Sequence, residues 1–221
     1  MVAFVRVERE GHNMARDTSP IVKQCRREGY ALHPKAHKIM AKKAGIPGMH
    51  ANGRPGKSSL YLTQLREKQK VRRTYGLLEK QFSRLMHEAA RSSDQGSLPG
   101  EILLQFLERR LDNAVYRAGF ATSRRASRQL VSHGHFMLNG RRVNIPSIRL
   151  KIGDEIVIRP KSAKSGYFSQ IDDIAKNTFQ PSLSWLKSDQ QKLTISITGL
   201  PKREEAEYDI KEQLIVEYYS R

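Results

Sequence analysis

The chain has 221 residues, of which 38% are apolar and 28% charged, a balance that suits one large or two small folded domains. Its single cysteine excludes an internal disulfide framework and a four-cysteine zinc site, and no apolar run approaches the roughly 18 residues of a membrane span. The net charge of +18 points to nucleic acid as the first class of partner and to an anionic membrane surface as the second.

The N-terminal quarter of the chain is basic and has little regular pattern. Met14 offers a second start, so residues 1–13 are expected to be an extension or an error in the gene model. The stretch before it has neither the apolar core of a signal peptide nor the acid-poor composition of a transit peptide. Residues 15–57 are rich in Lys, Arg, Gly and Pro, and the frequent glycines and prolines of 45–57 predict an extended loop.

Two helices are predicted next. Ser58 or Ser59 can cap a helix over 60–75, and Gly76 ends it. Apolar residues at helical spacing predict a second helix over 77–90, with one face turned toward a core. Both helices precede the centre of the chain.

A long helix and a short helix are predicted in the centre of the chain. Pro99 suits the start of the long helix, whose apolar residues keep helical spacing as far as Gly119. Ser123 can cap the short helix, and Gly134 ends it.

Strands are predicted beyond that point, so the expected fold class is α+β. Asn139-Gly140 suits a type I′ turn between two apolar-bearing strands. A second strand pair is expected around Gly153-Asp154, and the alternating residues of 192–198 predict one more strand.

The positive charge is concentrated in two segments. Residues 1–80 carry a net charge of +12 and residues 101–160 carry +6, whereas segments 81–100 and 161–221 are each neutral. The two basic segments are therefore the expected contacts with a polyanion, and the balanced tail needs a different explanation.

The short central helix breaks a local rule. Arg124, Arg125 and Arg128 lie in its first two turns, where the helix dipole disfavours cations. A bound phosphate would remove this repulsion, and arginines add bidentate donors for it. Arg141 and Arg142 follow the hairpin turn, so two basic edges are expected to face one groove and to contact RNA backbone. A solvated basic face is the alternative interpretation.

One long segment and five short motifs occur in a recognisable order. They are LERRLDNAVYRAGFATSRRASRQLVSHGHFMLNGRRVNIPS (107–147), CRREG (25–29), IPGMH (46–50), LREKQKVRRTYG (65–76), EKQF (79–82) and EQLIVEYYSR (212–221). The long segment resembles the RNA-binding module of the S-four superfamily. With the short motifs, the resemblance extends over nearly the whole chain from Met14 to the bacterial-type S-four family of small-subunit ribosomal proteins, in its zinc-free form.

The resemblance implies a mostly helical domain with an inserted RNA-binding module, in which two helices pack on a small antiparallel sheet. The expected divisions are a basic arm and helical domain over 14–98, the module over 99–190, and a C-terminal tail over 191–221 that returns to the helical domain.

The resemblance also implies a structural, non-catalytic role. Family members bind small-subunit ribosomal RNA directly and early, at a multi-helix junction of its 5′ domain, and nucleate assembly. They line the channel through which mRNA enters, beside the ribosomal proteins S-five and S-three, and changes at the contact with S-five affect decoding accuracy. The expected location is the cytoplasmic ribosome, from which the sequence does not distinguish an organellar one.

Residue by residue, the resemblance implies a set of RNA contacts and a protein interface. The RNA-contacting residues are Arg26, Arg27, Arg66, Lys68, Lys70, Arg72, Arg73, Arg117, Arg124, Arg125, Arg128, Gln129, His133, His135, Arg141 and Arg142. Tyr218 and Tyr219, in the charge-balanced tail, are expected to meet a neighbouring protein.

No metal ion or cofactor is expected. Many members of the family carry four zinc-binding cysteines near the N-terminus, whereas here Val22 stands at the first position and only Cys25 remains. His33 and His37 lie nearby at helical spacing, but one thiol and two histidines lack a fourth ligand.

Other functions have weaker support. The loop GRPGKSS (53–59) lacks the spacing of a nucleotide-binding P-loop, so Lys57 is expected to contact RNA backbone instead. The histidines at 133 and 135 suit a helix C-terminus better than catalysis. An RNA-modifying enzyme would need a catalytic constellation in the flanks, and a free regulatory protein would not need the motifs outside the module. The basic helix at 65–73 lacks the broad apolar face of a membrane-surface helix.

Overall fold

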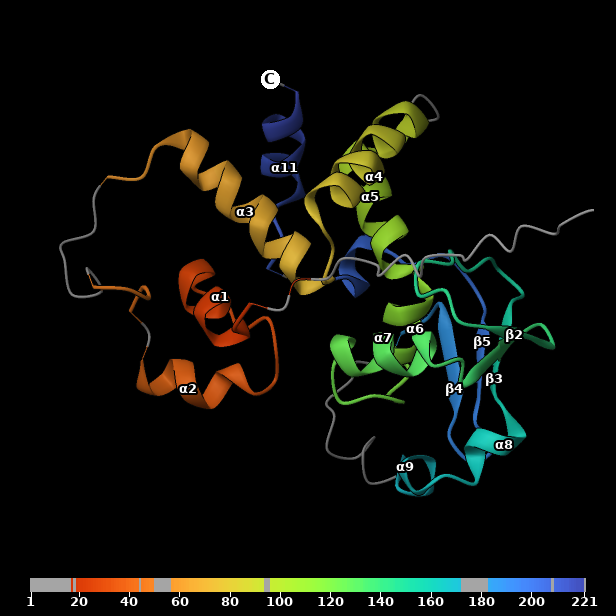
Figure 1. Ribbon diagram of the computed structural model, residues 1–221. Helices are drawn as coiled ribbons and strands as arrows, with labels where there is room; N and C mark the ends of the chain where they lie inside the picture. The colour runs from red at the N-terminus through yellow and green to blue at the C-terminus, as the bar shows by residue number, and fades with distance from the viewer. Residues whose placement is uncertain are drawn as a thin grey trace, which may run out of the picture.

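The computed structural model describes residues 17, 19–43, 45–49, 57–93, 96–171, 183–207 and 209–220. In these ranges the chain forms ten α-helices and one five-stranded antiparallel sheet, so the α+β prediction is confirmed. Figure 1 shows α1 to α5 and the C-terminal helix α11 at the left and top of the view, and the sheet at the lower right with α6 to α9 around it.

Seven of the described helices precede the sheet. They are α1 (Ile21–Glu28), α2 (Ala36–Lys42), α3 (Leu60–Thr74), α4 (Glu79–Ser92), α5 (Pro99–Glu108), α6 (Leu111–Arg117) and α7 (Arg124–Ser132). Strands and short helices follow as β1 (Phe136–Leu138), β2 (Arg141–Val143), β3 (Glu155–Ile158), α8 (Pro160–Ala163), α9 (Gly166–Ser169), β4 (Leu186–Asp189), β5 (Thr194–Ile197), the 3₁₀ turn η2 (Arg203–Glu205) and α11 (Glu212–Tyr219).

Helix α3 begins and ends where its capping residues predict. The Ser59 hydroxyl accepts a hydrogen bond from the backbone N–H of Leu62 at 3.2 Å, and Gly76 has a left-handed φ of 64° just after the helix. Helices α1 and α2 were not predicted, because each is only two turns long and the small core they share is formed around Cys25, Leu32 and Ala36.

The single helix predicted from Pro99 to the glycine at 119 is wrong, because the chain breaks into α5 and α6. Arg110 between them is extended, with φ −68° and ψ 139°. Its neighbours bond to a distant segment instead, since Leu111 N–H donates to the Ile148 carbonyl and Leu150 N–H to the Arg109 carbonyl, both at 2.9 Å. Tertiary hydrogen bonds therefore replace helical ones at the break.

The hairpin prediction is confirmed. Strands β1 and β2 pair from Phe136–Val143 to Leu138–Arg141, and the two turn residues Asn139 and Gly140 have φ values of 48° and 78°. Both angles are positive, as a type I′ turn requires. The turn thus sets Arg141 and the following arginine at the start of an edge strand.

The second predicted strand pair, around Gly153-Asp154, is wrong. The segment before that turn forms only one isolated bridge, from Arg149 to Arg110, and β3 pairs with β1 and β5 instead. The strand predicted over 192–198 is found as β5. The sheet order is β2-β1-β3-β5-β4, which puts β2 and β4 at opposite edges.

Among the described residues, two large hydrophobic cores divide the molecule. The first joins the sheet to α6 and α7 around buried side chains such as Leu111, Phe136 and Trp185; we call this part, α6 to β5, the sheet module. The second is built around residues such as Phe82 and Leu103 of α4 and α5, with contributions from α3 and α11. We call this part the helical body, and α1 with α2 the N-terminal lobe.

Candidate nucleic-acid interface

Helix α7 does not present all of its arginines to solvent. Ser123 caps the helix as predicted, since its hydroxyl accepts from Ala126 N–H at 3.3 Å. Arg124 turns inward, where its Nε donates to Asn113 Oδ1 at 2.8 Å and its Nη2 to Glu207 Oε1 at 2.6 Å. The repulsion between the first arginine and the helix dipole is therefore offset inside the protein itself.

A second arginine is buried beside it. Arg117 forms a bidentate pair with Glu108, with Nε–Oε2 and Nη2–Oε1 distances of 3.1 and 2.8 Å, and the Glu108 side chain is 1% exposed. Burial acts to raise the pKa of Glu108, but the charge and hydrogen bonds of Arg117 more than offset it and lower the pKa below its usual value. Tyr75 and Asn113 donate to the same carboxylate.

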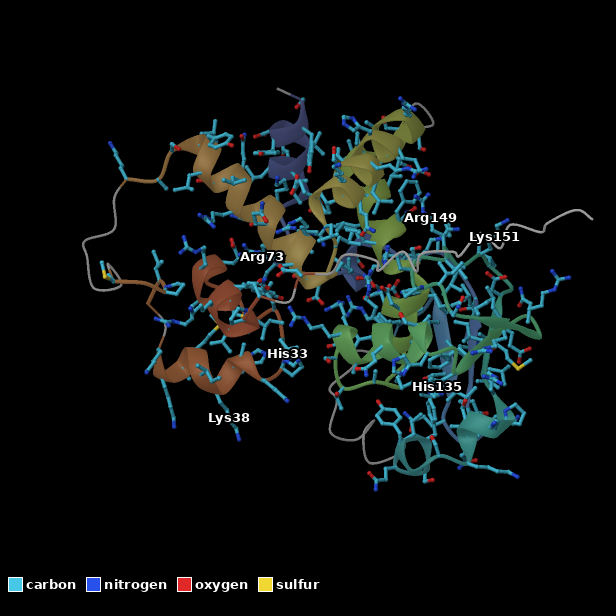
Figure 2. All side chains as sticks on the ribbon, in the orientation of Figure 1. His33, Lys38, Arg73, His135, Arg149 and Lys151 are labelled. Carbon is cyan, nitrogen blue, oxygen red and sulfur yellow. The ribbon has the colours of Figure 1, made fainter. Side chains whose placement is uncertain are left out.

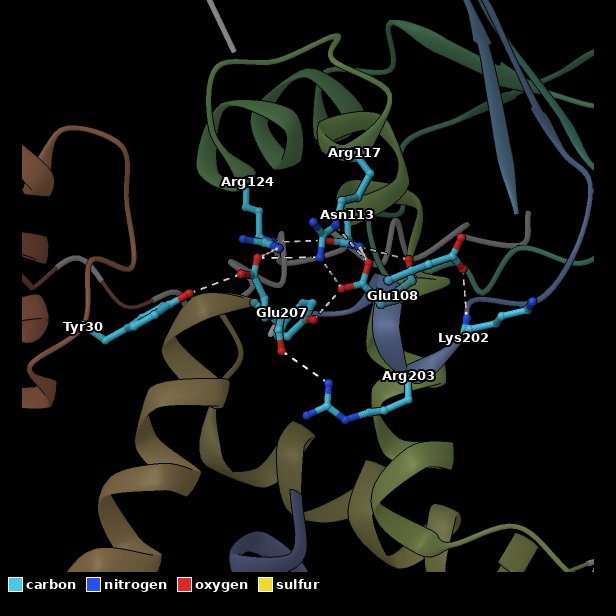
Figure 3. A network of polar contacts seen from close by, with 10 residues as sticks. Tyr30, Glu108, Asn113, Arg117, Arg124, Lys202, Arg203 and Glu207 are labelled. Carbon is cyan, nitrogen blue, oxygen red and sulfur yellow. Dashed lines mark hydrogen bonds and ion pairs between the residues drawn. The ribbon is translucent and has the colours of Figure 1, made fainter. Parts of the chain in front are cut away.

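Glu207 connects these groups to the N-terminal lobe. Its carboxylate lies 2.6 Å from Arg124 and 3.6 Å from Arg117, and it accepts from the Tyr30 hydroxyl at 3.2 Å. Burial and the Glu207 charge raise the pKa of Tyr30 to about 12. Figure 3 shows these side chains converging from separate segments of the chain.

We call this set the central network. Its members are Tyr30, Tyr75, Glu108, Asn113, Arg117, Arg124 and Glu207. It contains two arginines and two glutamates, so its charges balance. Because it joins the N-terminal lobe, the helical body and the sheet module, it fixes these three parts relative to one another.

The third arginine of α7 is also engaged. Arg128 Nη1 lies 3.6 Å from Asp112 Oδ2 and donates to the Gly76 carbonyl at 3.4 Å. Asp112 in turn binds Arg110 through two hydrogen bonds of 3.0 and 2.9 Å. Arg128 therefore connects the sheet module to the end of α3.

Five of the expected contact residues do lie at the surface of the module. Exposed side chains extend along α7 and onto the β2 edge strand; they are Arg125, Gln129, His133, Arg141 and Arg142. Among the residues that the structure describes, none of these three arginines forms an ion pair with a carboxylate, and Arg125 donates only to the Asp17 carbonyl, at 3.5 Å. This face keeps its positive charge.

His135 lies just below that face and is partly buried. Its Nδ1 is 3.0 Å from the Ser162 hydroxyl, and its ring meets the edge of Phe168 at 5.8 Å. Figure 2 labels it at the lower part of the module. Burial, followed by the charges of His133, Arg159 and Arg142, lowers the pKa of His135.

The basic residues of α3 are largely engaged within the protein. Lys68 is buried, 2.7 Å from Glu79, and Lys70 lies 3.4 Å from Glu67. Arg72 is 3.7 Å from Glu79. Arg66 and Arg73 both bind Glu28, whose side chain is fully buried. The basic residues of α3 that are expected to contact RNA therefore also form ion pairs within the protein, several of which join α3 to α1 and α4.

The N-terminal lobe carries a second basic surface. A pocket of about 360 Å³ lies between α1, the 47–48 loop and the end of α3, and three of its eight lining residues are cationic: Lys23, Arg27 and Arg73. Arg26 Nε donates to the Gly45 carbonyl at 2.8 Å, whereas Lys57 is exposed just before α3.

The C-terminal tyrosines pack on the helical body. Tyr219 donates to Glu79 at 2.9 Å and lies against Phe82. Tyr218 is 5.8 Å from Tyr61, ring centroid to ring centroid, and beneath Lys68. The start of α3 also exposes Leu60 and Leu62, the sequence neighbours of Tyr61.

The structure shows where the candidate metal ligands of the N-terminal segment lie. In the described ranges, no three His, Cys, Asp or Glu side chains gather closely enough to hold a metal ion. Cys25 is buried, and His33 Nδ1 accepts from Lys35 N–H while His37 is exposed. Among the helices described, none has the length and apolar character needed to cross a membrane.

Sequence reasoning missed the acidic partners and one basic residue. Glu108, Asn113 and Arg117 lie close together in the sequence. The prediction of one continuous helix, which is wrong, concealed that their side chains meet. Arg159, at the end of β3, donates to the Gly134 carbonyl and stands beside His135. Its only sequence signal is its place before Pro160 at a strand end.

Comparison with known families matches the chain in two adjoining segments. Residues 16–108 match the ribosomal protein S4/S9 N-terminal domain, and residues 109–156 match the S4 domain. The boundary between the two matches falls at the break between α5 and α6.

Whole-length relatives are found in several bacteria. Small ribosomal subunit protein uS4 of Chloroflexus aurantiacus is 46% identical over 209 residues, and that of Syntrophomonas wolfei is 45% identical over 214 residues. The protein of the same name from Acidobacterium capsulatum is 46% identical over 214 residues. Each alignment covers 94% of this chain and 100% of the relative.

Proposed function

The chain belongs to the small ribosomal subunit protein uS4 family, and from this premise we propose that it binds small-subunit ribosomal RNA early and nucleates assembly of the 5′ domain. As a member of that family it is a structural constituent of the small subunit with an RNA-binding S4 domain, and the family is non-enzymatic. Its place of action is therefore the ribosome.

The observation that carries the proposal is the uncompensated basic face of the sheet module. Arg125, His133, Arg141 and Arg142 are exposed there, and the described residues supply no carboxylate that neutralises the arginines. Such a face binds phosphates and releases counterions, which gives affinity that falls steeply with salt. Specificity then comes from the shape of the RNA junction.

Two separate surfaces are proposed to contact the RNA. The first is the module face, with Gln129 and His135 beside its arginines, and the second is the N-terminal surface lined by Arg27 and by Arg73, which also pairs with Glu28. Lys57, exposed before the start of α3, is a further proposed contact. The central network holds the two in one relative orientation. A protein built in this way can clamp several RNA helices in a fixed arrangement.

Eight other expected contacts are assigned mainly to the fold. Their side chains are engaged with carboxylates or backbone carbonyls of the protein, which leaves them less available to a phosphate. They are Arg26, Arg66, Lys68, Lys70, Arg72, Arg117, Arg124 and Arg128.

The proposed domain boundaries follow the two cores. The expected module ran over 99–190, but α5 packs in the core of the helical body and β5 packs in the core of the module. We therefore place the module at about 109–198, as an insertion in a helical domain that includes α11. The contacts of α11 with α3 and α5 support the return of the tail to that domain.

The surface around Tyr61 and Tyr218 is the proposed contact with ribosomal protein S-five. Leu60 and Leu62 are also exposed at the start of α3, and aromatic side chains are enriched in protein interfaces. The same proposal includes a position beside S-five and S-three, on the channel through which mRNA enters, and an effect on decoding accuracy. Both of these points rest on the family resemblance.

The proposal is tested by equilibrium binding to the 5′-domain fragment of small-subunit ribosomal RNA across a salt titration. A non-junction RNA of equal length serves as competitor. We expect tight binding that survives at moderately high salt and that the competitor does not displace. Equal binding of both RNAs, lost together as salt rises, would reduce the chain to a general polycation and contradict the proposal.

A further inference from the structure

Gly134 lies between two guanidinium groups at the end of α7. It is buried and has a φ of +72°. Nε and Nη2 of Arg142 lie only 2.8 and 2.9 Å from the position a Cβ would occupy there, so the guanidinium rests directly on the glycine. Arg159, which directly follows β3, donates from Nη1 to the Gly134 carbonyl at 3.1 Å.

Two imidazole rings complete the group. His133 and His135 flank the glycine, with ring centroids 6.1 Å apart. The Nδ1 atom of His135 forms a hydrogen bond with the Ser162 hydroxyl, which fixes the orientation of the ring. Nε2 has no hydrogen-bond partner among the described groups, so it is left for an outside acceptor. We call Gly134 with Arg142, Arg159, His133 and His135 the Gly134 cluster.

The cluster has no acidic counterpart in the described part of the chain. The groups that face His135 are His133 from the end of α7, Arg142 from β2 and Arg159 from the end of β3, while Ser162 of α8 and Phe168 of α9 are uncharged. Like charges held together in this way repel one another, and the repulsion lowers stability unless an anion is bound.

The arginines in the interior of the same module differ from those of the Gly134 cluster, because they have acidic partners. Arg117 and Arg124 are each matched by a glutamate within hydrogen-bond distance, whereas no carboxylate of the described residues pairs with Arg142 or Arg159. The module thus neutralises the arginines that it uses internally and leaves these two with their charge.

We propose that the Gly134 cluster binds one phosphate group of an RNA backbone, with the guanidiniums of Arg142 and Arg159 and the imidazole of His135 as its donors. This inference rests on the proposed function and gives it a specific anchoring point. Guanidiniums match the planar edge of a phosphate with two parallel N–H donors, and they retain their charge at all relevant pH values. Free phosphate shares this chemistry, so the test must separate the two sources.

Proton uptake is the signature that distinguishes this site from an ordinary basic surface. Without a ligand, burial and the neighbouring cations keep the pKa of His135 low, so the ring is neutral near pH 7. A bound phosphate places a negative charge beside it and favours the imidazolium. RNA affinity should therefore rise as the pH falls, by up to about tenfold per pH unit when one proton is taken up.

The test measures RNA binding by the full chain between pH 5.5 and 8, for the wild type and for R142A, H135Q and K187A. Lys187 is the matched control, because it is an exposed cation on β4, at the opposite edge of the sheet. We expect R142A to weaken binding and reduce the salt slope by about one, H135Q to abolish most of the pH dependence, and K187A to behave as the wild type.

Histidine C–H signals, assigned by loss in H135Q, report the ring directly. We expect RNA to raise the pKa of His135 and millimolar inorganic phosphate alone to leave it unchanged. A shift with inorganic phosphate and none with RNA would assign the site to free phosphate and overturn the proposal.

The measurements distinguish failure of the Gly134 cluster as a phosphate site from failure of the proposed function. If the wild type prefers the 5′-domain RNA but R142A and H135Q match K187A, the Gly134 cluster is not the anchor and the proposed function stands. If the wild type shows no preference for that RNA at any pH, the proposed function itself fails. Circular dichroism of each variant establishes that it is folded.

Discussion

The guanidinium of Arg124 lies 2.6 Å from the carboxylate of Glu207, although 83 residues separate the two in the sequence. Arg124 is in the sheet module, and Glu207 is in the segment that leads back to the helical body. Their contact, with the neighbouring pair of Arg117 and Glu108, makes the junction between the two parts a polar one. Buried ion pairs of this kind contribute geometry more reliably than stability.

Removing one member of the buried pair should be costly. In Arg117→Met the aliphatic volume is largely retained, but Glu108 is left as a buried carboxylate without its main partner. We expect a loss of about 3–5 kcal/mol in the free energy of unfolding, measured by urea denaturation at pH 7. The double variant with Glu108→Gln should recover part of that loss. Equal stability of the single variant and the wild type would show that the pair is not needed.

Adjacent arginines of α7 should have opposite effects. Arg125→Ala removes an exposed cation, so we expect unchanged thermal stability and a salt slope of RNA binding that is smaller by about one. Arg124→Ala should instead lower stability and leave the salt slope unchanged, because its charge is matched by Glu207. Both variants are measured by thermal unfolding and by RNA binding in a salt series. A reduced slope for Arg124→Ala with normal stability would return that residue to the RNA surface.

The central network should make stability depend on pH in the acidic range. Burial acts to raise the pKa of Glu207, but Arg124 and Arg117 more than offset it, so the folded-state pKa lies below the ordinary value of 4.5. The stability that comes from its ionisation is therefore present above pH 4.5 and is lost as the pH falls through the folded-state pKa. In urea titrations, the difference between the wild type and Glu207→Gln should shrink between about pH 5 and pH 3. A constant difference over that range would contradict this role.

Local signals in the sequence predicted local structure well. Ser59, Ser123 and the Asn139-Gly140 turn each act within four residues, and the structure places a cap or a turn at each. Their hydrogen bonds and dihedral angles depend on near neighbours alone, which is why sequence patterns reveal them.

Features set by distant partners were not predictable in the same way. Apolar spacing continues across Arg110, so the break in the helix becomes visible only when the hydrogen bonds to 146–150 are known. The inward turn of Arg124 likewise depends on Glu207, which no local pattern associates with it. The arginine-rich sequence of α7 therefore indicated a region of positive charge, but it did not indicate which of its arginines are exposed.

The hairpin turn should be sensitive to a single methyl group. Gly140 has a φ of +78° and no heavy atom within 4 Å of an added Cβ, so Gly140→Ala introduces backbone strain without a clash. We expect a loss of about 1–2 kcal/mol in the free energy of unfolding. Gly166→Ala is the matched control, since that glycine is equally open but has no left-handed φ, and it should be neutral or slightly stabilising.

The same pair of variants tests whether the turn positions the arginines of β2. Arg141 follows Gly140 directly, and Arg142 reaches back from there to Gly134. A strained turn should displace both guanidiniums, so Gly140→Ala should weaken RNA binding while Gly166→Ala leaves it unchanged. The measurement is made well below the unfolding temperature of both variants, so that reduced stability does not itself lower the bound fraction. If Gly140→Ala binds RNA as tightly as the wild type despite its lower stability, the hairpin adapts to the RNA, and the geometry of the turn does not determine the contact.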